Sequence, residues 1–145
     1  MAVILALDPG LKRVGLAISD PLGTLASPLC ALRRKPHGAF LEALEAIIAE
    51  RAPTALVVGL PARSDGRLGK EAQAALSLAF ELRAKFGLPV ETVDESYTTL
   101  EAREILFRNG VPDGPRLLAK IDQCAAGLIL ERYLAKLPNM TLPLE

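Results

Sequence analysis

The sequence predicts a single α/β domain built on a mixed β-sheet. Half of its 145 residues are hydrophobic and 23% are charged, so apolar side chains are abundant enough for one buried core. Short β-branched and leucine-rich runs, bounded by Gly, Pro and Asp, occur beside longer segments whose apolar residues recur at helical spacing. We expect one domain over residues 1–137 and a C-terminal tail over residues 138–145.

The first three strand-like runs predict an antiparallel meander. Ala2–Asp8 is short and apolar and stops at a Pro-Gly turn, which is typical of a strand buried on both faces. Only a few residues separate it from the run Val14–Asp20, so a hairpin is favoured over a helical crossover. The third run, Thr24–Leu32, contains Pro28, which a sheet tolerates best at its edge.

Two further strands and four helices follow. Gly87 marks the end of one helix, and Thr98 with Glu101 forms a capping box that opens another. The predicted elements after the meander are the helix Gly38–Arg51, the strand Thr54–Leu60, the helix Lys70–Phe86, the strand Val90–Glu95, the helix Thr98–Arg108 and the helix Pro115–Lys136.

This order of elements is the layout of a ribonuclease H-like fold, a five-stranded mixed sheet with helices on both faces. In such a sheet, ligands bind beyond the carboxyl ends of the parallel strands. A ligand site is therefore expected at the carboxyl ends of the first, fourth and fifth predicted strands.

Composition excludes several classes of protein. Seventeen Lys and Arg balance seventeen Asp and Glu, so any nucleic acid must be bound by a local patch and not by a global positive field. Cys30 and Cys124 lie far apart in the sequence and match no zinc-ligand spacing, which argues against a structural zinc site and against a disulfide-rich scaffold. The opening run has neither a basic n-region nor the length of a membrane span, and we expect a cytoplasmic protein.

Two carboxylates stand at predicted strand ends. Asp8 ends the most apolar strand, where the simplest interpretation is a turn residue. Glu95 ends the fifth strand directly after Asp94. Because strand side chains alternate, only one of these two neighbours can join a given site, and alternation alone leaves the choice open.

A third carboxylate, Asp122, falls on the apolar face of the last helix, where Ala125, Ala126 and Ile129 are its neighbours at helical spacing. A carboxylate placed against a sheet needs a cation, a metal or another partner. One alternative is a structural ion pair with an arginine.

If Asp8, Glu95 and Asp122 converge, they require a cation between them. An all-oxygen ligand set selects Mg²⁺ or Mn²⁺, and two such ions about 4 Å apart would clamp a phosphodiester for hydrolysis. The only histidine, His37, is predicted in a basic loop with Arg33, so no nucleophile with a histidine base is available. That loop is ordinarily a solvated surface, although it could also contact phosphates.

Four stretches of the chain resemble, in order, the motifs of the YqgF/RuvX family, the Holliday junction resolvase or pre-16S rRNA nuclease group. They are Asp8–Asp20, Val57–Pro61 followed by Asp65-Gly66, Asp94-Glu95 with Thr98–Ala102, and Lys120–Asp122 with Ala125-Ala126 and Ile129-Leu130. The resemblance implies a ribonuclease H-like fold and metal-dependent cleavage of nucleic acid. It also implies that Asp8, Glu95 and Asp122 are the catalytic and metal-binding carboxylates.

Two positions depart from the family pattern. Ser96 stands where the third motif usually has an arginine, and the second motif usually has an asparagine near Arg63-Ser64. Since the three carboxylates are kept, the departures indicate an altered substrate contact.

We expect Lys12 and Arg13 to hold backbone phosphates, helped by Arg63, Arg67 and Lys70. The alternative is that these are solvated loop charges. The substrate is either the 5′ end of pre-16S ribosomal RNA or a Holliday junction, and junction cleavage would favour a homodimer. A non-catalytic RNA-binding or transcription or ribosome-associated factor on the same fold is the alternative function.

Overall fold

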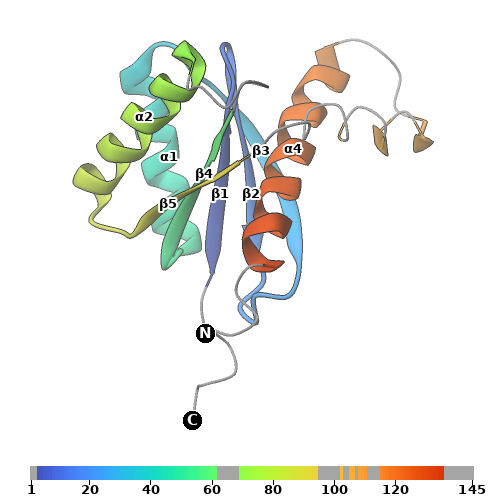
Figure 1. Cartoon of the computed structure of the whole chain (residues 1–145), viewed down its shortest axis with the longest axis horizontal. Coiled ribbons are helices and arrows are strands. Elements are labelled where there is room, and N and C mark those ends of the chain that lie inside the picture. The colour runs from blue at the N-terminus through green and yellow to red at the C-terminus, as the bar shows by residue number, and fades with distance from the viewer. Residues whose placement is uncertain are drawn as a thin grey trace.

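The computed structural model describes residues 3–61, 69–94, 102, 105, 106, 108–110 and 115–135. Five strands form one sheet in the order β3-β2-β1-β4-β5. Helices α1 and α2 cover one face, and α4 covers the other (Figure 1). The elements are β1 Ile4–Pro9, β2 Arg13–Ser19, β3 Ala26–Arg33, α1 His37–Arg51, β4 Ala55–Leu60, α2 Lys70–Phe86, β5 Val90–Asp94 and α4 Pro115–Ala135.

The strand directions confirm the predicted mixed sheet. β1, β2 and β3 are an antiparallel meander, whereas β4 pairs parallel to β1 and β5 pairs parallel to β4. β3 lies at the edge of the sheet, as Pro28 indicated. The carboxyl ends of β1, β4 and β5 therefore meet at one edge, where the ligand site of such a sheet is built.

Most predicted boundaries agree with the structure, and α2 has the same bounds. Gly87 closes α2 in the left-handed region, with φ of 66°, and its N–H donates to the Arg83 carbonyl. One prediction was wrong, because His37 does not lie in a loop. It begins α1 after Pro36 as N-cap, so the loop ends one residue earlier, and its Nε2 lies 2.8 Å from a Glu81 carboxylate oxygen in α2.

Some predictions fall outside the described residues. Residues 102, 105, 106 and 108 are helical, in line with the predicted helix Thr98–Arg108, but its capping residues are not described. The tail 138–145 and the exact end of the domain also lie outside. In the described part of the chain, no helix is long and apolar enough to cross a membrane.

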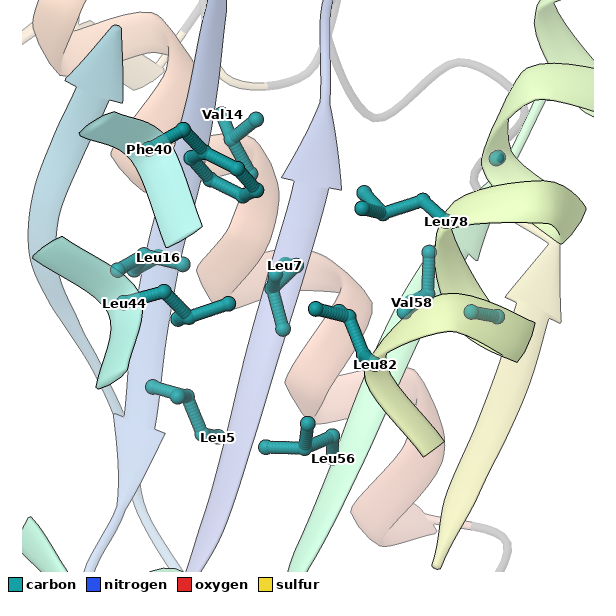
Figure 2. Packing of buried hydrophobic residues seen from close by; sticks show 12 residues of the cluster. Leu5, Leu7, Val14, Leu16, Phe40, Leu44, Leu56, Val58, Leu78 and Leu82 are labelled. Carbon is teal, nitrogen blue, oxygen red and sulfur yellow. The ribbon is translucent and has the colours of Figure 1, made fainter. Parts of the chain in front are cut away.

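The sheet separates two hydrophobic layers. On the α1 and α2 side, Leu5 and Leu7 of β1 pack with side chains of β2, β4 and both helices (Figure 2). On the α4 side, Ile4 and Ala6 pack with Ala126, Ile129 and Leu130 of α4. β1 is thus buried on both faces, and its even-numbered residues point toward α4.

Candidate active site

Asp8 lies at the carboxyl end of β1 and faces α4. It shares the face of Ile4 and Ala6 and is only 7% exposed. In the antiparallel pairing of β1 with β2 its partner is Gly15. Because residues directly opposite each other in an antiparallel pair point to the same face, the missing side chain of Gly15 leaves space beside Asp8 on the α4 side.

The backbone of α4 fills that space with Asp122. A Cβ atom added at Gly15 would lie 2.0 Å from the Asp122 carbonyl oxygen and 3.0 Å from the Asp122 Cβ. Buried Ala125 and Ala126, the next small residues of the helix, accompany this close approach. Asp8 and Asp122, which come from opposite ends of the sequence, are therefore neighbours on one face of the sheet.

Asp122 is paired with Arg13 of β2. The Arg13 Nε atom lies 2.6 Å from the Asp122 Oδ2 atom, and the two side chains are 31% and 19% exposed. Arg13 lies on the same face as Gly15, two residues earlier in the strand. The structure therefore places Arg13, predicted from sequence to bind phosphate, in the arginine ion pair that was the alternative for Asp122.

The turn between β1 and β2 is held by Arg34, the residue that follows β3. The Gly10 N–H donates to the Arg13 carbonyl at 2.8 Å, and Arg34 Nη1 donates to the Gly10 carbonyl at 2.7 Å. The backbone N–H of Arg34 also donates to the Lys12 carbonyl at 2.9 Å. These contacts fix the backbone of the turn that follows Asp8 and carries the exposed Lys12.

At its other end, α4 is anchored to β5. The Tyr133 hydroxyl donates to a Glu91 carboxylate oxygen at 2.5 Å, and Arg132 Nη1 donates to the Asp94 carbonyl at 3.0 Å. Burial, followed by the Glu91 contact, raises the pKa of Tyr133 to about 12. The helix that carries Asp122 is therefore joined to β2 through Arg13 and to β5 through Tyr133 and Arg132.

The Asp94 side chain is directed away from this site. Val93 packs in the α4 layer, so its neighbour Asp94 points to the other face. The parallel partner of Asp94, Leu60, packs with the α1 and α2 layer. Of the two acidic neighbours at the end of β5, Asp94 is therefore not on the face of Asp8 and Asp122.

Of the remaining predicted residues, Lys70 begins α2 and is exposed. It follows the carboxyl end of β4, the strand beside β1, so it lies toward the same edge of the sheet. Glu95, Arg63, Arg67 and Ser96 lie outside the described residues. Sequence reasoning did not identify the role of Gly15 in the approach of α4 or that of Arg34 in holding the turn; a glycine inside a buried strand was the available signal for the first.

The two aspartates of this site carry the type of ligand atom that a hard cation prefers. Asp8 and Asp122 offer oxygen ligands on one face, the donor type that Mg²⁺ and Mn²⁺ prefer. Within the described ranges, no group of three or more His, Cys, Asp and Glu side chains forms a complete metal cluster. Asp8 and Asp122 are the two predicted carboxylates that the described part of the chain brings to this face.

Comparison with known sequences places the chain in a family. The family model described as RuvX, Holliday junction resolvase, matches residues 2–136. A Moorella thermoacetica protein named "Putative pre-16S rRNA nuclease" is 41% identical over 134 residues, which cover 92% of this chain and 95% of the relative. A Thermosynechococcus vestitus protein of the same name is 40% identical over 135 residues, which cover 92% of this chain and 88% of the relative.

Solved structures show the same fold. Thermus thermophilus RuvC in complex with a Holliday junction substrate superposes with a TM-score of 0.55 at 18% identity, covering 95% of this chain and 97% of RuvC. Fowlpox virus resolvase in complex with Holliday junction DNA has a TM-score of 0.54 at 10% identity, covering 94% and 99% of the two chains. These likenesses confirm the ribonuclease H-like fold. Since the family model spans nearly the whole sequence and the relatives reach 41% identity, the chain belongs to the RuvX family.

Proposed function

We propose that this chain is a metal-dependent nuclease that hydrolyses phosphodiester bonds of structured nucleic acid. The observation that carries the proposal is the meeting of Asp8 and Asp122 on one face, through the close approach of α4 to Gly15. Two carboxylates brought together from distant segments favour a cation beside them, and Arg13 supplies one positive charge at Asp122. Membership of the RuvX family and the nuclease names of its relatives support the same chemistry.

Asp8 and Asp122 would hold Mg²⁺ or Mn²⁺, with Glu95 as the third ligand indicated by the family resemblance. We propose that these three carboxylates would hold two such ions. A bound cation would supply the Lewis acid for the attacked phosphorus and for the leaving oxygen. The chain itself places the two aspartates and, through Lys12, offers a positive charge to the substrate backbone beside them.

The substrate is a structured nucleic acid of one of two kinds. The relatives' name points to the 5′ end of pre-16S ribosomal RNA, and the family description points to a Holliday junction. Junction cleavage needs two cuts related by symmetry, so it would favour a homodimer, whereas trimming of an RNA end would not. Sedimentation of the chain with each substrate tests this difference.

The decisive experiment offers the purified chain both substrates, end-labelled, with Mg²⁺, with Mn²⁺ and with EDTA. We expect cleavage of at least one substrate with a divalent ion and none in EDTA. Asp8→Asn and Asp122→Asn should each abolish cleavage. Asp20→Asn is the matched control, because Asp20 lies in the turn after β2, at the opposite edge of the sheet.

Two results would contradict the proposal. One is an Asp122→Asn chain that cleaves at the wild-type rate, and the other is cleavage that persists in EDTA. A wild-type chain that binds RNA tightly without cutting either substrate would instead favour the non-catalytic RNA-binding alternative.

A further inference from the structure

Five basic residues stand where β2 begins and β3 ends, and some of them bind other groups of the protein whereas others are exposed. Arg34 is held by the Gly10 carbonyl, and Arg13 is held by Asp122. Lys12, Arg33 and Lys35 are exposed. We call these last three residues the basic edge.

Arg33 lies on the same face of the sheet as the two aspartates. Its partner in the pairing of β2 with β3 is Arg13, whose side chain reaches Asp122, and paired residues point to the same face. The preceding residue, Leu32, packs with the layer on the opposite face, which gives Arg33 the same orientation independently. An exposed guanidinium therefore stands beside the site, beyond the one that Asp122 engages.

Lys12 and Lys35, the other two residues of the basic edge, are close in sequence to Arg13 and Arg33. Lys12 directly precedes β2, and its carbonyl accepts a hydrogen bond from the Arg34 N–H, which brings the two segments together. Lys35 follows Arg34 in the chain. The net charge of the protein is zero, so three exposed cations grouped at one edge are a local feature that its overall charge does not produce.

We infer that the basic edge binds the phosphate backbone of the nucleic-acid segment that flanks the cleaved bond. Because α4 packs over β2 and β3, the substrate would pass along the edge of the sheet where β2 begins and β3 ends. The inference rests on the proposed nuclease function and specifies the path of its substrate. Phosphate contacts from Lys and Arg fix the position of a nucleic acid without reading its sequence. The same surface would therefore serve RNA and DNA.

The register of the sheet gives the reach of this contact. Asp8 and Arg33 are separated by two strand spacings and by two residues along β2. With strands roughly 4.8 Å apart and a rise of roughly 3.3 Å per residue, their Cα atoms are about 12 Å apart. Because α4 lies over β2 between these two residues, the path of a bound strand is longer than this direct separation, so Arg33 would contact a phosphate several nucleotides from the cleaved bond.

The test measures fluorescence anisotropy of a labelled RNA hairpin and of a labelled four-way DNA junction, in EDTA and over a series of salt concentrations. Arg33→Ala and Lys35→Ala should each weaken binding several-fold and lower the salt slope by about one. Arg83→Ala is the matched control. Arg83 is exposed in the last turn of α2, and α2 leads from the carboxyl end of β4 to the start of β5, so its last turn lies at the opposite edge.

Probe length makes the test specific. When the probe is cut back to two nucleotides on one side of the cleaved bond and then on the other, one of the truncations should remove the effect of Arg33→Ala. Arg33→Lys should recover most of the lost affinity, because it keeps the charge. Unchanged melting temperatures of the variants would show that binding, not folding, was altered.

The outcomes separate the two proposals. If the wild-type chain cleaves its substrate while Arg33→Ala and Lys35→Ala bind like Arg83→Ala, the inference about the basic edge is overturned and the nuclease stands. If binding depends on Arg33 but no metal supports cleavage, the basic edge stands and the proposed nuclease function is contradicted.

Discussion

Arg13 and Asp122 are joined by an ion pair of 2.6 Å although 109 residues separate them in the sequence. Arg13 comes from the strand that pairs with β1, and Asp122 comes from the helix that lies on that strand. A metal cation that binds the Asp122 carboxylate would share it with the guanidinium of Arg13, whose positive charge opposes that binding. The two roles that the sequence suggested for Arg13 and Asp122, phosphate binding and metal binding, are therefore linked through one contact.

Removing the charge of Arg13 should strengthen metal binding. We expect Arg13→Gln to tighten Mn²⁺ binding roughly threefold to tenfold, because Asp122 is then no longer engaged by a guanidinium. Isothermal titration calorimetry of the wild type and the variant measures this change. In an Asp122→Asn background the substitution at residue 13 should have no such effect. Weaker Mn²⁺ binding by Arg13→Gln would instead mean that Arg13 only positions Asp122.

Adding a single methyl group at Gly15 should separate α4 from the sheet. The new Cβ would lie 2.0 Å from the Asp122 carbonyl oxygen, so Gly15→Ala is expected to destabilise the protein by about 1–3 kcal/mol or more. Gly127→Ala, in the same helix, is the control. Among the described residues, its Cβ would meet only the Pro28 Cγ atom at 3.9 Å, and it should stabilise the helix by about 0.5–1 kcal/mol. Urea denaturation of both variants tests the contrast, and equal stabilities would refute the close approach.

Local patterns in the sequence predicted the elements well, whereas contacts between elements were harder to predict. Helical spacing and the Gly87 cap were sufficient to place α2, and the pattern around Asp122 placed that residue on the apolar face of α4. The partner of Asp122 could not be chosen, because many arginines are available and only the tertiary packing brings Arg13 to it. In the same way, the importance of Gly15 depends on which helix lies over β2, a question that no local pattern answers.

The pKa of Tyr133 provides a test of the anchor between α4 and β5. Burial and the Glu91 contact raise this pKa to about 12. Because the folded pKa lies above the ordinary value of about 10, the stabilisation is complete below pH 10 and is lost as the pH rises toward 12. Absorbance at 295 nm, compared with Tyr133→Phe, should show Tyr133 still protonated at pH 11. Ionisation near pH 10 would show that the anchor does not form.

Metal binding should stabilise the fold in a manner that depends on the carboxylates. At a Mn²⁺ concentration of 100 times the dissociation constant, the free energy of unfolding should rise by about 2.7 kcal/mol, which corresponds to roughly 5–10 °C in melting temperature for a domain of this size. Asp8→Asn and Asp122→Asn should abolish the shift, while Asp20→Asn should retain it. Without metal, Asp122→Asn should cost at most about 1 kcal/mol, the value of a partly exposed ion pair.

Glu95→Gln, set against Glu45→Gln on the exposed surface of α1, decides whether Glu95 is the third ligand. A full Mn²⁺ shift in Glu95→Gln would remove that residue from the site, and a full shift in Asp8→Asn would remove the site itself.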